Sequence, residues 1–191
     1  MNKIVLASAS ERRITLLKKW GLKFKICPSD ITEKTKFKRP SAIVKDLSLQ
    51  KAKAVQKQNK DSIIISADTI VVLNGKIIGK PKNKKHAMQI LSELNGSYHK
   101  VYTGVTILAQ NKKENFYDVA VVKMKKISQE QLQILSAKNL DKAGAYAVQD
   151  KQDNFVKKIY GDYYTVVGLP YYKLKEKLKP FAIKLTAATK L

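Results

Sequence analysis

The stretch SIIISADTIVVL, residues 62–73, decides the fold, because it carries the strongest strand signal in the chain. The three isoleucines near its start predict a buried strand, which we expect to end within Ser66–Thr69. Residues 70–73 are expected to continue in extended form. Asn74-Gly75 then predicts a hairpin turn, with Lys76–Gly79 returning beside the first strand.

Asp68 is the one acid of this stretch, and its flanks are apolar on both sides. An unpaired carboxylate in such surroundings is costly, since desolvation disfavours its charged form. A metal ion, a cation or a set of hydrogen bonds must compensate. The alternative is a carboxylate that only caps a turn at the end of the strand.

On both sides of this stretch, predicted strands and helices alternate along the chain, and predicted hairpins interrupt the alternation. The pattern predicts an α/β fold with a mixed, twisted sheet and flanking helices. Residues 1–180 are expected to form one domain, with a C-terminal tail at 181–191. Further strands are expected at 3–7, 24–27, 99–109 and 116–126, with short strands around Tyr146, Phe155 and Val166. Helices are expected at 11–20, 40–58 and 83–94. Another helix is expected to follow a capping box formed by Ser128 and Gln131, and a last one to begin near Pro170.

The charge of the chain is strongly positive, with 38 Lys and Arg against 15 Asp and Glu in 191 residues. Only Arg12, Arg13 and Arg39 are arginines, which disfavours a sequence-specific reader of DNA, since such proteins rely on the arginine fork. Salt-sensitive, nonspecific binding to polyanions is expected. A nucleic-acid-binding protein without catalysis is therefore an alternative to an enzyme.

Cys27 is the single cysteine, so an intrachain disulfide and a cysteine-rich zinc site are both excluded. His86 and His99 are the only histidines. His86 is expected to be solvated and His99, in a predicted strand, to be structural, so a histidine-based hydrolase is disfavoured. Any metal must be held mainly by carboxylates, which suits Mg or Mn. No apolar run approaches the roughly 18 residues of a membrane span, and the N-terminus does not resemble a secretory signal. We expect a cytoplasmic protein.

The turn Ser8–Arg13 is a candidate phosphate site. It leads from a strand through small residues into a helix N-terminus, where backbone N–H groups favour anions. Ser8 and Ser10 add hydroxyl donors, and Arg12 and Arg13 add forked ones. Lys51, Lys80, Glu33 and Gln149 are weaker candidates, each with an ordinary surface or loop role as the alternative.

Seven motifs now stand in order along the chain, and together they resemble the Maf family of nucleotide pyrophosphatases from Ile4 to about Lys177. They are 8–13 (SASERR), 29–33 (SDITE), 51–52 (KA), 67–69 (ADT), 79–81 (GKP), 141–146 (DKAGAY) and 167–170 (VGLP). The resemblance implies an inosine-triphosphatase-like fold with two lobes around a central cleft, a homodimer, and cleavage between the α and β phosphates with Mg or Mn.

By position, the resemblance implies a role for each candidate residue. Asp68 is the expected catalytic carboxylate, assisted by Lys51 and Lys80; Glu33 and Asp68 would hold the metal; Ser8, Ser10, Arg12, Arg13, Thr69 and Gln149 would bind substrate. Arg12, Thr69 and Gln149 match the subgroup similar to dTTP/UTP pyrophosphatases. This implies dTTP and UTP as substrates, with modified pyrimidine nucleotides as an open alternative, and a role in removing unwanted nucleotides from the nucleotide pool.

Two alternatives remain within the resemblance. A sister subgroup acts on 7-methyl-GTP, and the family is also associated with septum formation, so a regulator of cell division without catalysis is a further reading. The chain departs from the family pattern at Glu11, where the family usually has Pro, at Asp150, where it has Gly, and at Gly161-Asp162, where it has Gly-Ser.

Overall fold

A seven-stranded mixed sheet forms the centre of the computed structural model, which describes residues 3–149 and 154–187. The strands follow the order β2-β1-β3-β5-β6-β7, with β4 paired to β3 outside this path. β1 pairs in parallel with β2 and β3, and the other pairings are antiparallel. The strands are β1 Lys3–Leu6, β2 Lys25–Ile26, β3 Ser62–Leu73, β4 Lys76–Ile78, β5 Tyr98–Leu108, β6 Lys113–Met124 and β7 Val156–Tyr160.

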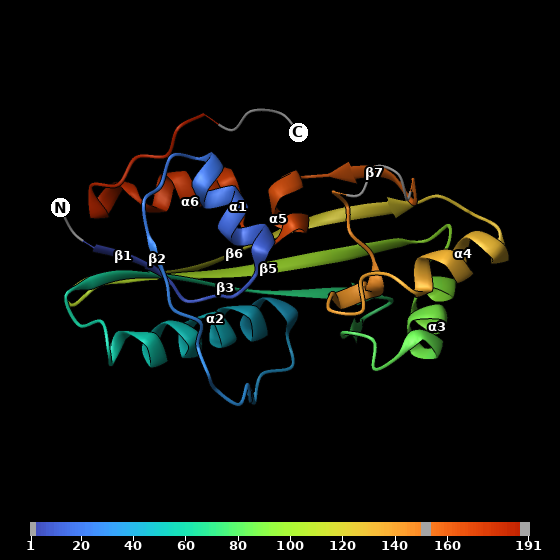
Figure 1. Ribbon diagram of the computed structural model, residues 1–191, viewed down its shortest axis with the longest axis horizontal. Helices are drawn as coiled ribbons and strands as arrows, with labels where there is room; N and C mark the ends of the chain where they lie inside the picture. Colours follow the sequence, from blue (N-terminus) through green and yellow to red (C-terminus); the bar gives the residue numbers. More distant parts are fainter. Residues whose placement is uncertain (1–2, 150–153, 188–191) are drawn as a thin grey trace.

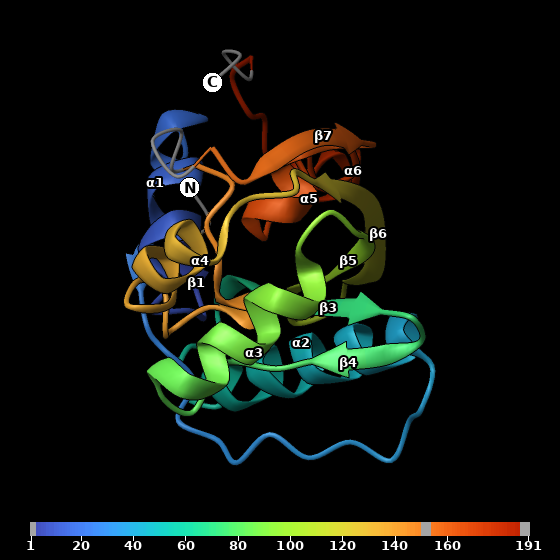
Figure 2. The same ribbon diagram turned by 90° about the vertical axis from the view of Figure 1, so that its right-hand side faces the viewer.

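The helices cover both faces of this sheet. In Figures 1 and 2, α2 runs along one side of β3, and α5 lies on the other side. They are α1 Glu11–Lys19, α2 Pro40–Gln56, α3 Lys84–Leu94, α4 Gln129–Ser136, α5 Tyr163–Val167 and α6 Tyr171–Lys177, with the 3₁₀ helices η1 Ala143–Ala145 and η3 Lys179–Phe181.

The side chains of β3 alternate between these two faces, as those of any strand do. Ile64 packs with Val5, Ala52 and Val55 of the α2 face. Ile63 and its odd-numbered neighbours pack into cores on the opposite face. The register of β3 therefore sends Asp68 towards α2 and Thr69 towards the other side.

Two separate hydrophobic cores lie on the face opposite α2, and each is the centre of one lobe. The first contains Trp20 of α1 and Leu174 of α6 with the amino-terminal half of β3. The second contains Leu91 of α3 and Leu132 of α4 with the carboxy-terminal half. The predicted division into two lobes therefore has a physical basis, since one long strand runs through both cores.

Most elements lie where the sequence predicts them, including the capping box at Ser128 and Gln131. Two of the predicted short strands are wrong. The predicted strand around Val166 is the helix α5, which begins after an Asp162 cap and ends at Gly168 in the left-handed conformation. The predicted strand around Tyr146 is instead η1 and the extended residue after it.

The C-terminal residues contribute to the first core. Phe181 and Leu185 are both buried there, and the Thr186 amide donates to the Trp20 carbonyl oxygen at 2.9 Å. The predicted boundary between domain and tail at residue 180 stays a prediction. Within residues 3–149 and 154–187, every helix is too short or too polar to cross a membrane.

Candidate active site

A gap in the pairing of β3 creates the candidate site. On one edge, β1 pairs with Ser62–Ile65 and β4 pairs with Val71–Leu73, while β5 pairs without a break with Ile64–Val72 on the opposite edge. Asp68 lies in the gap, opposite Gly104 of β5. The prediction that the strand ends at Ser66–Thr69 is therefore wrong: β3 is continuous, and the neighbouring strand is what ends.

A cavity of about 800 Å³ opens at this gap, a volume within the range of small-molecule sites. Its walls come from both lobes, from the turn before α1 on one side and from the β4 loop and η1 on the other. Nine of the ten predicted site residues line it. The tenth, Gln149, is half-buried in the turn that follows Val148, which is the last lining residue before the undescribed segment 150–153.

Three charged side chains meet on the α2 side of the cavity. Lys51 Nζ lies 2.7 Å from Asp68 Oδ1 and 3.0 Å from Glu33 Oε1, so α2, β3 and the loop before α2 are joined through one ammonium group. The Asp68 and Lys51 side chains are 10% and 12% exposed, whereas Glu33 is 45% exposed. Lys51 is thus the cation that compensates for the buried carboxylate.

The second oxygen of Asp68 has a different environment. Asp68 Oδ2 is buried and makes no hydrogen bond to any residue that the structure describes. A buried acceptor without a partner is rare in folded proteins and frequently marks a functional position. The oxygen is available to a ligand, a metal ion or a water molecule in the cavity.

Arg13 holds a fixed position on the opposite side of β3. Its Nε donates to the Gly168 carbonyl oxygen at 2.9 Å, Nη1 to Ser8 Oγ at 3.3 Å, and Nη2 to Thr69 Oγ1 at 3.0 Å. Burial lowers the pKa of Arg13 to about 10, an effect that the negative charge of Asp68 opposes. The guanidinium therefore stays charged at neutral pH.

Arg12 lies beside Asp141 and Tyr146, two cavity residues of the 141–146 motif for which no site role was predicted. Burial lowers the pKa of Arg12, and the charge of Asp141 partly opposes this. Tyr146 is buried, and its hydroxyl lies 2.7 Å from His99 Nε2. The expectation that His99 is structural agrees with this contact.

Gly144 is the residue in the sequence that could have indicated a turn, and not a strand, before Tyr146. Its φ of 78° is left-handed, and a Cβ at this position would lie 3.1 Å from the Tyr146 ring. Ala145 is also left-handed, with φ 57°. Two such residues in succession exclude the strand that the sequence predicts here.

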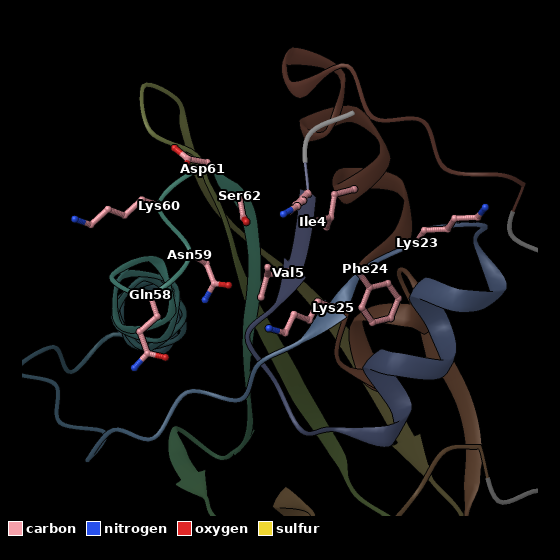
Figure 3. Close-up of a pocket in the computed structure, with 11 residues that line it drawn as sticks. Ile4, Val5, Lys23, Phe24, Lys25, Gln58, Asn59, Lys60, Asp61 and Ser62 are labelled. Atoms are coloured by element: carbon pink, nitrogen blue, oxygen red, sulfur yellow. The ribbon is translucent and has the colours of Figure 1, made fainter.

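A second cavity, of about 570 Å³, lies between the β1–β2 end of the sheet and the segment after α2. Four lysines line it, but Figure 3 shows Lys23 and Lys60 pointing away from it in opposite directions. Its charged groups do not converge on a common point. The cavity at Asp68 is therefore the candidate active site.

The metal-binding groups at that cavity are two carboxylates. No group of three His, Cys, Asp or Glu side chains suited to a metal occurs within residues 3–149 and 154–187. Glu33 and Asp68 nevertheless reach the same Lys51 nitrogen, so their oxygens lie close together.

Comparison with known proteins identifies relatives over nearly the whole chain. A dTTP/UTP pyrophosphatase of Bacillus anthracis is 45% identical over 191 residues, covering 98% of this chain and 100% of the relative. A dTTP/UTP pyrophosphatase of Elusimicrobium minutum is 45% identical over 181 residues, covering 94% and 98%.

A solved structure, that of the Staphylococcus aureus Ham1 protein, matches with a TM-score of 0.51 at 14% identity. It covers 81% of this chain and 91% of the other, and it supports the predicted inosine-triphosphatase-like fold. The family profile described as Maf-like protein matches residues 3–181. With this match and these relatives, the chain belongs to the Maf family, as its motifs predicted.

Proposed function

We propose that the protein hydrolyses dTTP and UTP to the nucleoside monophosphate and pyrophosphate in the cavity between its two lobes. The observation that carries the proposal is the pair of environments at Asp68: Lys51 fixes one oxygen, and the other is buried and has no partner in residues 3–149 and 154–187. A carboxylate so held can accept a proton from a water molecule that attacks a phosphoanhydride. The substrates follow the name shared by the relatives.

The polar half of the cavity suits a triphosphate. The helix α1 begins after Ser10, and the turn residues Ser8 and Ser10 line the cavity together with Arg12 and Arg13. The N-terminus of a helix favours anions. Lys80 stands at the exposed rim. Fixed cations at these positions stabilise the charge that develops on departing pyrophosphate.

The two carboxylates fit a hard divalent cation such as Mg or Mn, for which carboxylate oxygens are suitable ligands. Asp68 Oδ2 offers an uncommitted oxygen, and Glu33 is exposed enough to rotate towards it. Glu33 and Asp68 would hold the ion, with its other positions left to water and phosphate oxygens. When bound, such an ion neutralises phosphate charge and lowers the pKa of a bound water.

Each charged side chain at the cavity then has a separate role in the reaction. Lys51 keeps Asp68 Oδ1 in place and donates its remaining N–H to a phosphate oxygen, while Asp68 accepts the proton of the attacking water. Arg13 has two N–H groups beyond the three already bonded, and these bind the leaving pyrophosphate.

The other half of the cavity is apolar and suits a nucleobase. Val71, Val101, Val166 and Tyr146 form its walls. Gln149 follows Val148, and we keep it as the residue proposed to read the edge of the base. A wall of this kind binds a flat ring and leaves discrimination to a few polar groups.

A panel of purified nucleotides tests the proposal. dTTP, UTP, ATP and 7-methyl-GTP are incubated with the protein and Mg or Mn, and pyrophosphate is scored separately from orthophosphate. We expect dTTP and UTP to give monophosphate and pyrophosphate. Orthophosphate as the sole product would place the cleavage at the γ position and refute the mechanism, and a preference for 7-methyl-GTP would move the chain to the sister subgroup.

Replacing Asp68 by Asn should lower kcat for UTP by at least about 100-fold, the usual size of an acid–base contribution. The matched control is Glu114→Gln. Glu114 is also a strand carboxylate paired with a lysine, at 3.3 Å from Lys177, but it lies outside the cavity. Near-normal turnover by the Asp68 variant would refute the assignment.

A further inference from the structure

A chain of hydrogen bonds runs from Arg13 away from the cavity. Arg13 Nη2 donates to Thr69 Oγ1 at 3.0 Å, Thr69 Oγ1 lies 2.9 Å from Thr103 Oγ1, and Thr103 Oγ1 donates to the Thr165 carbonyl oxygen at 2.7 Å. The chain links four segments that are far apart in sequence: α1, β3, β5 and α5.

The direction of each hydrogen bond follows from the bond at the far end of the chain, which Thr103 donates to Thr165. The Thr165 carbonyl can only accept, so the single proton of the Thr103 hydroxyl is used there. Thr69 must therefore be the donor to Thr103, which uses its own proton. Thr69 is left as an acceptor towards Arg13, and every bond of the chain points away from the cavity.

Thr103 and Thr165 are both 0% exposed, and Thr103 is not part of the cavity wall. Thr103 is thus out of reach of a substrate. Its hydroxyl is held by a backbone carbonyl of the helix α5. This carbonyl lies three residues before the left-handed C-cap Gly168, whose own carbonyl oxygen accepts from Arg13.

We propose that Thr103 is a positioning residue for the pyrophosphatase reaction. By fixing Thr69 as an acceptor, it holds the Arg13 guanidinium in the orientation that leaves two N–H groups for phosphate. Thr69 then acts through Arg13 and cannot donate to the substrate, in contrast to the substrate contact predicted for it. The inference rests on the proposed role of Arg13 in binding phosphate.

Without the Thr103 hydroxyl, the Thr69 proton loses its acceptor. It can turn towards Arg13, where it opposes the guanidinium N–H, or towards the cavity. Either change loosens the position of Arg13 while leaving its charge in place. The expected defect is in the geometry of the reacting complex, which is felt in kcat more than in KM.

The test compares Thr103→Val with Thr103→Ser in steady-state hydrolysis of UTP. The valine variant has nearly the same shape and should lower kcat by about 10- to 100-fold, with KM changed by less than about threefold. The serine variant restores the hydroxyl and should recover most of the rate. A serine variant as slow as the valine variant, or a valine variant as fast as the wild type, overturns the proposal.

Thr106→Val is the matched control for a loss of packing. Thr106 is on the same strand and is also 0% exposed, but its hydroxyl contacts Ser48 and Asn115 instead of the chain to Arg13. Urea unfolding should show both valine variants destabilised, with kcat of the folded enzyme reduced only for Thr103. Equal losses of kcat would show a structural role and refute positioning.

Coupling to Arg13 gives an independent readout. In an Arg13→Lys background the planar fork is absent, so Thr103→Val should have little further effect on kcat; independent, multiplicative losses contradict the proposal. The Arg13 Nε–H signal, followed by NMR with a bound α,β-imido UTP analogue, should shift or broaden in Thr103→Val and not in Thr106→Val. This arm does not need turnover, so a wild type that fails to cleave UTP refutes the proposed function while the positioning of Arg13 is still tested.

Discussion

Asp68 has two oxygens with different surroundings, and this difference comes from single side chains. Lys51 holds Oδ1, while Oδ2 is buried without a partner among the described residues. The cost of burying a carboxylate predicts a cation near Asp68 from the sequence. That the cation is a lysine shared with Glu33 depends on how α2 packs.

Replacing Lys51 by Gln should tighten binding of Mn in the absence of nucleotide. The ammonium lies between Glu33 and Asp68, so its removal leaves two carboxylates without a shared cation. At least about tenfold tighter binding is expected, given the size of a unit charge interaction at this range. Calorimetric titration with Mn measures it, and UTP turnover by the same variant should fall.

The control is Lys80→Gln. Lys80 lines the same cavity, and no ion pair in the described part of the chain involves it. Its removal should leave Mn affinity within about threefold. Unchanged or weaker Mn binding by the Lys51 variant would show that the lysine does not compete for the carboxylates.

His99 gives the folded protein a defined pH dependence. Burial lowers its pKa to about 4, whereas the unfolded chain keeps about 6.5. Between these values the unfolded state binds more protons, so stability rises with pH and is lost as pH falls from about 6.5 to 4. The loss should be on the order of 3 kcal/mol by pH 4.

Urea unfolding of wild type and His99→Gln at pH 7, 5.5 and 4.5 checks this. The variant is less stable at pH 7, since it loses the contact with Tyr146. The gap between the two proteins should narrow as pH falls, because only the wild type has an imidazole to protonate. Parallel stability curves would contradict the low pKa.

Local signals predict most strands and helices of this chain, and propensity misleads where capping residues or tertiary contacts override it. Thr165, Val166 and Val167 are β-branched and favour a strand. They form a helix because Asp162 caps it and Gly168 ends it in the left-handed conformation. Both signals were visible in the sequence, but the apolar pattern outweighed them.

The contact between α2 and the sheet shows the same limit. Gly104 of β5 is opposite Asp68, and the backbone of Val44 in α2 lies directly above it. Nothing in the sequence around Gly104 indicates this approach. It brings α2, and with it Lys51, within reach of Asp68.

Replacing Gly104 by Ala should destabilise the fold by about 3 kcal/mol, the upper range for overpacking. The added Cβ would lie 2.2 Å from the Val44 carbonyl oxygen, and backbone cannot turn aside as a side chain can. Urea unfolding measures the loss. Gly79→Ala is the control for stability, since a Cβ there meets nothing within 4 Å; equal stability of the two variants would refute the close contact.

The molecule as a whole consists of two cores joined by β3, with the cavity between them. The last described residues belong to the first core. Tyr171 donates its hydroxyl to the Thr186 carbonyl oxygen at 2.7 Å, beside buried Leu185. The net charge of the chain is +23, and this positive charge should attract anionic nucleotides to the molecule.

A chain that ends at residue 180 should lose at least about 4 kcal/mol of stability. It lacks the buried side chains of Phe181 and Leu185. Each large apolar side chain of this kind contributes about 2 kcal/mol or more to stability. Urea unfolding of this chain is compared with one that ends at Ala187, which keeps every contact described above. Full stability at residue 180 would instead support the predicted boundary between domain and tail.

The sequence by itself determined the family, the α/β class, the strand around Asp68 and nine residues of the cavity wall, because motifs, periodicity and caps act over a few neighbouring positions. Only the tertiary structure decided that β1 ends beside an unbroken β3, that Lys51 joins Glu33 to Asp68, and that Thr103 fixes Arg13. These contacts join segments separated by tens of residues. Their geometry depends on strand register and helix packing, which local sequence does not encode.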